Sequence, residues 1–425
     1  MTTAPKSPRR KDAMKPQRVL GIIMAGGKGE RLLPLTEVRS KPAVQFGGKY
    51  RIIDFVLSNF VNSGITSLYV LVQYRSQSLI EHLRKSWQMG GRLSDSFVSV
   101  VPPQMRARDG WYEGTADAVY QNLNLIADWE PDVIAVFGAD HVYRMDIRQM
   151  LSEHLAHDAD ATVAALPVRA DAASSFGILE VDESARMIGF EEKPSLPKEI
   201  PGRPGYALSS MGNYLFKTAA LVPLLRRDAS RPGTHDFGRN IVPELLGEHR
   251  VYAYNLETNE IPGLHAYEER AYWRDVGTLE AYWQSNMDLL GEAPLFNLRN
   301  PAWPIYSNET EGPMAALVRT RVDDSMIGQA TLCVDADIRK SVIGRGVQIE
   351  RGAQVEECVI MDNVHIGPHA RLRRVIADRG SSVPGHARIG YDRATDGRRF
   401  HVSHSGLVVL PHPSSASAGV LRQAS

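Results

Sequence analysis

Short apolar runs alternate with segments of helical periodicity over the first two thirds of the chain. The apolar stretches at residues 19–24, 67–73 and 133–137 have the length and composition of buried strands. Between them, apolar residues recur three or four positions apart, as on the buried face of an amphipathic helix. Strands that alternate with helices in this way predict a mostly parallel sheet covered on both faces. We therefore expect a Rossmann-like α/β domain over residues 18–290.

The same patterns predict the remaining elements of this domain. One helix is expected to end at Asn62, before Gly64, and Thr115 is expected to be the N-cap of another. Further helices are predicted over residues 76–87, 116–129, 145–157 and 279–290. Further strands are predicted at residues 97–101, 207–217 and 251–257, and additions to the core sheet at 161–168, 178–181 and 187–191.

Beyond residue 313 the apolar residues recur at every sixth position, as in Ile343, Ile349 and Val355. Apolar residues also recur at a spacing of 17 residues. One such series is Leu332, Ile349, Ile366 and Val383, and a second is Ile338, Val355, Leu372 and Ile389. This double period predicts a left-handed parallel β-helix of hexapeptide turns over residues 314–410. Many such domains are acyltransferases, but no histidine in this one has the context of an acyl-transfer base. We expect it to support assembly and effector binding.

The segments around these two domains have a different composition. Residues 291–313 hold four prolines and no clean periodicity, which predicts a linker. Residues 1–17 are polar and are expected to be flexible, and the Ser/Ala-rich residues 411–425 are expected to be a disordered tail.

The first apolar run leads into a glycine-rich loop with two cations behind it. Gly26, Gly27 and Gly29 leave the backbone N–H groups open to a polyanion, and Arg31 and Lys41 follow. The dinucleotide fingerprint would need a glycine three residues past Gly29, where Leu32 stands, and a P-loop would need Lys after its last glycine. The loop therefore predicts a phosphate site of another kind.

Two acids are candidates for binding a metal ion. Asp140 follows the apolar run at residues 133–137, and Asp275 lies in a short polar turn before a helix. At the carboxyl end of a sheet, such carboxylates can hold Mg²⁺ together with phosphate oxygens, although each could instead cap the next helix. The two acids and the loop together favour metal-assisted phosphoryl chemistry. His141 is treated as an ordinary histidine because no second histidine stands at metal-ligand spacing.

The composition indicates a globular protein without the excess of basic residues that binding to nucleic acid or an anionic membrane would need. The 425 residues include 49 basic and 49 acidic ones, so we expect neither nucleic acid nor an anionic membrane as a partner. No apolar run is long enough to span a membrane. Cys333 and Cys358 are too few for a disulfide scaffold; they suit a reducing cytoplasm and are expected to be small buried hydrophobes.

Several longer motifs carry a resemblance to a known family. They read GGKGERLLPLT, WYEGTADAVYQN, FGADHVYRMD, EEKP, SSMGNYLF and AYWRDVGTLEAYW. Together they resemble the sugar-1-phosphate nucleotidyltransferases over about residues 18–410. Within that family the resemblance is to bacterial enzymes that transfer the adenylyl group of ATP to α-D-glucose 1-phosphate, giving ADP-glucose and diphosphate for glycogen synthesis. It also implies Mg²⁺ as cofactor and a homotetramer that is regulated by metabolites.

The resemblance implies a role for each residue that matches a family motif. The loop at Gly26, Gly27 and Gly29 would wrap the ATP phosphates, Arg31 and Lys41 would stabilise charge on the departing diphosphate, and Asp140 and Asp275 would bind Mg²⁺. The glucose 1-phosphate site would be formed by Gly177, Glu192, Lys193 and Ser210. Tyr112 would contact the nucleotide sugar, and Gln73 and Gln104 would lie near adenine.

The resemblance also implies a regulatory site for a sugar-phosphate or nucleotide effector, formed by Arg39, Arg51, Arg371 and Arg374. The enteric members place a lysine at the position of Val38 and a histidine at that of Gln45, so the effector here need not be fructose 1,6-bisphosphate. Fructose 6-phosphate and glucose 6-phosphate are candidates beside it.

Two other functions remain open at this stage. The protein could use dTTP, UTP or GTP in place of ATP, because the glycine loop is shared and the base site differs. It could instead be a regulatory subunit without turnover, although the presence of Arg31, Lys41, Asp140, Lys193 and Asp275 argues against this.

Overall fold

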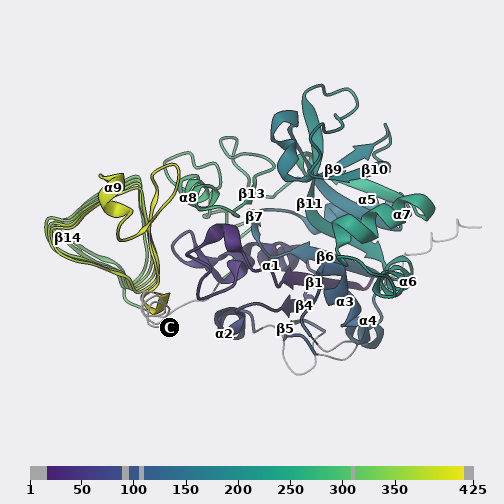
Figure 1. Ribbon diagram of the computed structural model, residues 1–425, viewed down its shortest axis with the longest axis horizontal. Coiled ribbons are helices and arrows are strands. Elements are labelled where there is room, and N and C mark those ends of the chain that lie inside the picture. Colours follow the sequence, from purple (N-terminus) through teal and green to yellow (C-terminus); the bar gives the residue numbers. More distant parts are fainter. Residues whose placement is uncertain (1–16, 89–94, 105–109, 308–311, 416–425) are drawn as a thin grey trace, which may run out of the picture.

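The computed structural model describes residues 17–88, 95–104, 110–307 and 312–415, which form an α/β domain and a three-sided β-helix (Figure 1). At the centre of the α/β domain is β1 (Val19–Ala25), the first predicted strand. It pairs in parallel with β4 (Ser67–Val72) and β6 (Val133–Gly138), and β4 pairs in parallel with β5 (Phe97–Val101). These four strands are the predicted parallel core.

The strands predicted as additions extend this core on one side. β11 (Tyr206–Lys217) runs antiparallel to β6 and pairs with both β8 (Ala161–Arg169) and β9 (Gly177–Val181). β10 (Met187–Glu192) pairs with β9, and β12 (Val251–Asn255) pairs with β8. In the described part of the chain the sheet therefore has nine strands.

Helices cover both faces of the sheet, because neighbouring residues of β1 point to opposite sides. Ile22 belongs to one buried apolar cluster and Ile23 to the other. The helices of this domain are α1 (Ile52–Asn62), α2 (Gln77–Ser86), α3 (Thr115–Tyr120), α4 (Leu123–Trp129), α5 (Ile147–Ala156), α6 (Thr218–Ala229), α7 (Val242–Glu248) and α8 (Leu279–Met287). Of these, α6 and α7 were not predicted from the sequence.

The helix predicted over residues 116–129 is wrong in two respects. It breaks at Gln121 and Asn122 into α3 and α4, and the N-cap of α3 is Gly114 rather than Thr115. The Thr115 hydroxyl donates instead to Asp236 Oδ2 at 2.9 Å and accepts from the backbone N–H of Phe237 at 3.0 Å. The Thr115 hydroxyl, which the local sequence predicted to cap the helix, therefore binds a segment that is distant in the chain.

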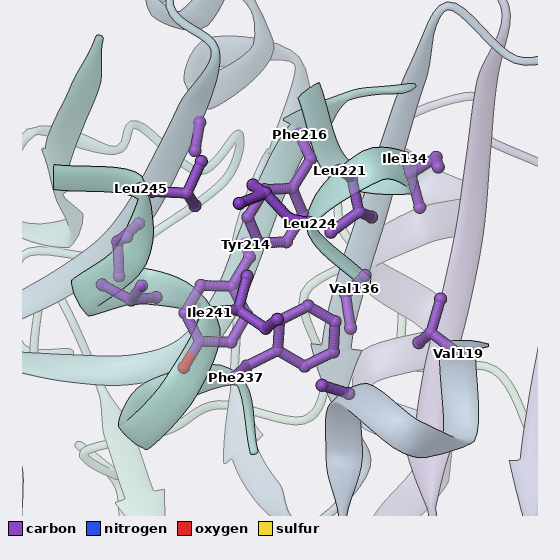
Figure 2. Close-up of a cluster of buried hydrophobic side chains, with 14 of the residues drawn as sticks. Val119, Ile134, Val136, Tyr214, Phe216, Leu221, Leu224, Phe237, Ile241 and Leu245 are labelled. Carbon is purple, nitrogen blue, oxygen red and sulfur yellow. The ribbon is translucent and has the colours of Figure 1, made fainter. Parts of the chain in front are cut away.

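That distant segment anchors one of the two buried clusters (Figure 2). The rings of Tyr214, Phe216 and Phe237 stack on one another, with centroids 5.5 Å apart between Phe237 and each of the other two. Leu221 and Leu224 of α6 pack in the same cluster. The turn at Phe237–Ile241, which leads into α7, is thereby fixed against β11.

The second domain is the predicted left-handed β-helix, and its strands form three sheets that are parallel except for one antiparallel strand at the edge of one sheet. Ile349 pairs with Ile366, and Ile338 pairs with Val355, as the 17-residue spacing requires. One position in the series is wrong: Cys333, not Leu332, aligns with Ile349, because the first coils are one residue shorter. Cys333 is accordingly buried, whereas Leu332 is 44% exposed.

The β-helix strands are short. They comprise β14 (Ala316–Val318), β15 (Arg321–Asp323), β16 (Met326–Ile327), β17 (Leu332–Val334), β18 (Asp337–Arg339), β19 (Val342–Ile343), β20 (Gln348–Ile349), β21 (Gln354–Glu356), β22 (Val359–Ile360), β23 (His365–Ile366), β24 (Arg371–Arg373), β25 (Val375–Ala377), β26 (Ser382–Val383) and β27 (Arg388–Ile389). After α9 (Arg393–Asp396) and β28 (His401–Val402), β29 (Val408–Leu410) pairs in parallel with β25.

The two domains share an apolar cluster, and α8 lies between them in Figure 1. Phe46 and Tyr282 of the first domain and Val359 and Ile376 of the second belong to this cluster. The Trp283 indole on α8 donates to the backbone oxygen of Glu357 at 2.8 Å. The domains are therefore packed together rather than tethered.

The segments that flank the domains are only partly described. Within the predicted linker, Trp303 is buried and donates to Asn59 Oδ1 at 3.3 Å, so this part packs on α1. Of the predicted tail, residues 411–415 are described, with Ser415 buried, and 416–425 lie outside the described residues, as does most of the predicted flexible N-terminus. Among the described helices, none combines the length and apolar character that a membrane span needs.

Candidate active site

A cleft of about 1030 Å³ opens where β1 and β6 end. Most of the residues that the sequence predicted as a site line it, although they come from segments far apart in the chain. They are Gly26, Gly27, Gly29, Arg31, Lys41, Gln73, Tyr112, Asp140, Gly177, Glu192, Lys193, Ser210 and Asp275.

The glycine loop forms one side of this cleft. Gly29 has φ 66°, a left-handed conformation that a side chain disfavours, and a Cβ there would lie 3.0 Å from Lys41 Cβ. At Gly27, by contrast, a Cβ would meet no described atom within 4 Å. The Thr36 hydroxyl donates to the Gly29 backbone oxygen at 2.8 Å and holds the loop in place. The loop is thus shaped by its neighbours at Gly29 and open to the cleft at Gly27.

Two short strands bring the predicted metal ligands together. β7 (His141–Tyr143) pairs antiparallel with β13 (Trp273–Asp275), and Asp275 lies opposite His141 in this ladder. Asp140 immediately precedes β7. Neither acid is a helix cap, because Asp146 caps α5 and Thr278 caps α8. The capping alternative is therefore wrong for both carboxylates.

Lys41 lies between these carboxylates. Its ammonium nitrogen is 2.7 Å from Asp275 Oδ1 and 3.1 Å from Asp140 Oδ2, and its side chain is 7% exposed. Burial alone would lower the pKa of Lys41, but the charges of Asp140 and Asp275 outweigh it and raise that pKa above its usual value. Arg31 contributes a second cation, 3.5 Å from Asp275 Oδ2, on a side chain that is 71% exposed.

The carboxylate of Asp140 is stabilised by the same charges. Burial opposes its ionisation, but the charges of His141 and Lys41 outweigh burial and hold the pKa of Asp140 below its usual range. Both ends of the Lys41–Asp140 pair are therefore charged at neutral pH.

A divalent cation fits the donor atoms at this point. The ligand atoms of Asp140, His141 and Asp275 lie within 4.8 Å of one another. His141 Nδ1 is buried without a hydrogen bond to any described residue, 3.4 Å from Asp140 Oδ1. Two carboxylates suit a hard cation, and the ring nitrogen is a third donor. The sequence analysis left His141 out because no second histidine stands at metal-ligand spacing, whereas the structure groups it with the two acids.

Lys193 and its neighbours form another part of the cleft. Lys193 adopts φ 53°, and its backbone N–H donates to Phe176 O at 2.9 Å. Its ammonium group lies 3.2 Å from Glu192 Oε1. A Cβ at Gly177 would approach Phe190 Cζ to 2.6 Å, which explains the glycine. The Ser210 hydroxyl accepts the Gly212 backbone N–H at 3.2 Å, which fixes Ser210 at the same cleft.

Gln73 and Tyr112 are joined by a pair of hydrogen bonds. The Gln73 amide donates to Tyr112 O at 3.2 Å, and Tyr112 N–H donates to Gln73 Oε1 at 3.0 Å. Gln104 does not line the cleft with them: it is exposed, and its amide donates to Pro102 O at 2.8 Å, next to residues that are not described. Its assignment to adenine stays a prediction.

The sequence missed one wall of the cleft, which is formed by Thr234, Asp236, Phe237 and Arg239. Asp236 Oδ1 accepts the backbone N–H groups of Gly238 at 3.0 Å and Arg239 at 3.2 Å. No loop motif marks this segment, and contacts with residues remote in the chain, at Thr115 and in the stack of Phe237 on Tyr214, bring it to the site.

None of the four arginines predicted to bind an effector lines the cleft in the described structure. Arg39 is buried at the domain interface and donates to Asp378 Oδ1 at 2.7 Å. Burial, together with the charges of Arg39 and Arg379, lowers the pKa of Arg51 to about 10, and Arg379 directly follows Asp378, the partner of Arg39. Arg379 was not predicted from the sequence.

The other two predicted arginines lie on the β-helix. Arg371 is exposed on β24, and the Arg374 guanidinium lies over the Trp283 ring, 4.5 Å from its centroid.

Comparison with known proteins identifies both domains. Residues 20–292 match the family model described as nucleotidyl transferase, and residues 314–410 match that described as GlmU-like, C-terminal hexapeptide. The chain is 48% identical over 395 residues to a protein of Thermodesulfovibrio yellowstonii named glucose-1-phosphate adenylyltransferase, covering 93% of this chain and 96% of that one.

Proteins with the same name from Anaeromyxobacter sp. and Deinococcus radiodurans are 48% and 45% identical to this chain. Those alignments cover 93% and 94% of this chain and 98% and 99% of the relatives.

Proposed function

The chain belongs to the glucose-1-phosphate adenylyltransferase family of nucleotidyl transferases, and on that premise we propose that it makes ADP-glucose and diphosphate from ATP and α-D-glucose 1-phosphate. The observation that carries this assignment is the meeting of Lys41 with Asp140 and Asp275 beside the glycine loop. That arrangement suits two anionic substrates and a metal ion.

The reaction joins two polyanions. A phosphate oxygen of glucose 1-phosphate attacks the α-phosphorus of ATP, and the bond from that phosphorus to the α–β bridging oxygen breaks, so that diphosphate leaves. The attacking oxygen is already anionic and needs no general base. The protein has to align the reactants and neutralise charge on the leaving group.

The described residues divide this work between them. The backbone of Gly26, Gly27 and Gly29 binds the triphosphate, and Arg31 and Lys41 stabilise the departing diphosphate. Glu192, Lys193, Gly177 and Ser210 bind glucose 1-phosphate in another part of the same cleft. Tyr112 contacts the nucleotide sugar, and Gln73 contacts adenine. All of these residues line the cleft, which supports the assignment.

Mg²⁺ is the metal we propose, held by Asp140 and Asp275. When bound, it supplies a Lewis acid that neutralises phosphate charge. The support for it is the close grouping of two carboxylates with a His141 nitrogen that has no hydrogen-bond partner among the described residues.

Diphosphate release from ATP and glucose 1-phosphate tests the reaction directly. We expect turnover that needs both substrates and Mg²⁺ and that stops on chelation. The same assay with UTP, dTTP and GTP tests base choice, and faster turnover with any of them would overturn the adenylyl assignment. Absence of diphosphate release with every nucleotide would favour a regulatory subunit instead.

For regulation, we propose that a phosphorylated effector binds at the domain interface, near Arg39, Arg51 and Arg379. Its support is a group of arginines at the junction between the catalytic domain and the β-helix. Arg371 and Arg374 remain candidates on the β-helix side. Initial rates with fructose 6-phosphate, glucose 6-phosphate, fructose 1,6-bisphosphate and AMP test this proposal, and identical rates with all four would contradict it.

The assembly and cellular setting are proposed with the function. We propose a homotetramer, which light scattering would test, and a role in glycogen synthesis. A reducing cytoplasm is supported by two free thiols, because burial raises the pKa of Cys333 to about 11 and that of Cys358 to about 12. Neither sulfur is therefore a reactive thiolate at neutral pH.

A further inference from the structure

We propose that the Lys41 ammonium group occupies the cation position between Asp140 and Asp275 when no ligand is bound, so that a divalent cation enters only after Lys41 turns away towards the triphosphate. This inference rests on the proposed function, and it adds a second role to Lys41. Besides stabilising the diphosphate, Lys41 would make metal binding conditional on the nucleotide.

The contacts of Lys41 place it where the cation has to bind. Its nitrogen lies 2.7 Å from Asp275 Oδ1 and 3.1 Å from Asp140 Oδ2, so it bridges the two acids as a shared ligand would. Asp140 and Asp275 would be the carboxylates that hold Mg²⁺, and the Lys41 ammonium group already contacts both of them. A lysine ammonium and a divalent cation of the same sign cannot both occupy the space between the acids.

A second cation of the protein adds to this exclusion. The Lys41 side chain is 7% exposed, whereas the Asp140 side chain that it contacts is 42% exposed at the cleft. Arg31 lies 3.5 Å from Asp275 Oδ2 and adds positive charge on the other side of that carboxylate. Cations of the protein itself, Lys41 and Arg31, therefore face these carboxylates.

The glycine loop offers Lys41 another partner. A Cβ at Gly29 would lie 3.0 Å from Lys41 Cβ, which shows that the lysine side chain starts against the loop that would hold the phosphates. A triphosphate bound there would present oxygens that compete with Asp140 and Asp275 for the ammonium group. Lysine is suited to this exchange, because its compact charge sits on a flexible four-carbon side chain.

The backbone on either side of Lys41 is held in place. Arg39 donates to Asp378 Oδ1 at 2.7 Å, and Gln45 donates to Asp362 Oδ1 at 2.6 Å, both on the β-helix. The Val44 backbone N–H donates to Lys41 O at 3.0 Å and closes the turn at Lys41–Ala43. The exchange therefore calls for rotation of the Lys41 side chain rather than a shift of the segment.

Binding of Mn²⁺ to the nucleotide-free protein tests the proposal. The electron paramagnetic resonance signal of unbound Mn²⁺ falls as the ion binds, so it measures affinity without turnover. Lys41→Met removes the charge and keeps most of the side chain. We expect it to bind Mn²⁺ at least tenfold more tightly than the unmodified protein. Affinity that is unchanged or weaker would overturn the proposal. Lys28→Met, on an exposed lysine of the same loop, is the matched control and should change the affinity less than threefold.

Two further variants keep the test decisive. Adding Asp140→Asn to Lys41→Met should remove the gain, and a gain that survives would place the new Mn²⁺ elsewhere and contradict the proposal. Lys41→Gln replaces Lys41→Met if the latter fails to fold, and the same tenfold gain is expected. Turnover of the unmodified protein with ATP and glucose 1-phosphate tests the proposed function separately, so each idea can fail alone.

Discussion

The ammonium group of Lys41 lies 2.7 Å from the Asp275 carboxylate, although 234 positions separate the two residues in the chain. Asp140 joins the same group from a third segment, at 3.1 Å from Lys41. The centre of the site is thus a contact between three distant parts of the sequence, and removing Lys41 would leave the carboxylates of Asp140 and Asp275 facing each other without the cation between them.

Asp140→Asn should lower kcat by about a hundredfold or more and change the KM for glucose 1-phosphate little. The asparagine keeps the shape of the side chain and removes the charge that faces Lys41 and the proposed metal, whose main effect is on the transition state. Steady-state diphosphate release measures both constants. Asp171→Asn, on an exposed acid outside the cleft, is the control. A raised KM with normal kcat would contradict the assigned role.

Lys193→Ala should raise the KM for glucose 1-phosphate tenfold or more and leave kcat within a few-fold. Lys193 lines the cleft beside Glu192, and its charge would be needed to bind the sugar phosphate before reaction. Lys198→Ala, on an exposed lysine five positions on, should leave both constants unchanged. If the KM for ATP rises instead, Lys193 belongs to the nucleotide side.

Gly114→Ala should destabilise the protein and abolish most activity. A Cβ at Gly114 would lie 2.1 Å from Thr234 O and 2.3 Å from His235 O. The loop that carries Tyr112 could then no longer pack against the segment that begins at Thr234 and forms one wall of the cleft. Thermal unfolding and diphosphate release measure the two effects.

Gly247→Ala is the matched control for this change. Gly247 lies in α7, and a Cβ there meets no described atom within 4 Å. Alanine should raise the stability of this helix by about 0.5–1 kcal/mol. Equal loss of stability in both variants would show that crowding at Gly114 is not the cause.

His154 should make the protein sensitive to acid. Burial lowers the pKa of His154 from 6.5 to about 4, and its Nε2 has no partner among the described residues. The unfolded chain therefore binds the proton first, and stability falls as the pH drops from 6.5 towards 4. The full loss from this group is about 3 kcal/mol.

His154→Gln should reduce that loss, because glutamine can keep the contact with the Thr162 hydroxyl (2.8 Å from His154 Nδ1) and does not titrate. Urea unfolding at pH 7 and pH 4.5 measures the difference. His401→Gln, on an exposed histidine, should behave like the unmodified protein. If both variants lose the same stability on acidification, other groups are responsible.

Local patterns predicted much of the architecture. The strands β1 and β6 and the 17-residue register of the β-helix follow from apolar periodicity, which is encoded within each segment. The glycine loop was also recognisable, because left-handed backbone at Gly29 and an open approach at Gly27 both call for glycine. The register of Leu332 was predicted wrongly because the first coils are a residue shorter than the rest, and the neighbouring apolar residues do not reveal this.

Local patterns were insufficient where a side chain has two partners to choose from. Thr115 has the chemistry of an N-cap, yet its hydroxyl bonds to Asp236, which is 121 positions away. Asp140 and Asp275 could each have capped a helix, and the pairing of β7 with β13 decides that they face Lys41 instead. The residues adjacent to a polar side chain in the sequence do not show which remote group will bind it in the fold.

The apolar pattern and the local motifs were sufficient to predict the two domains, the phosphate loop and the charged residues available for chemistry. The contacts between these residues depend on the folded chain. Folding brings Asp275 to Asp140 and His141, adds the wall around Asp236 to the cleft and places Arg39 against Asp378 at the domain interface. The physical reason is that apolar periodicity acts within a segment, whereas ion pairs and strand ladders depend on the path of the whole chain.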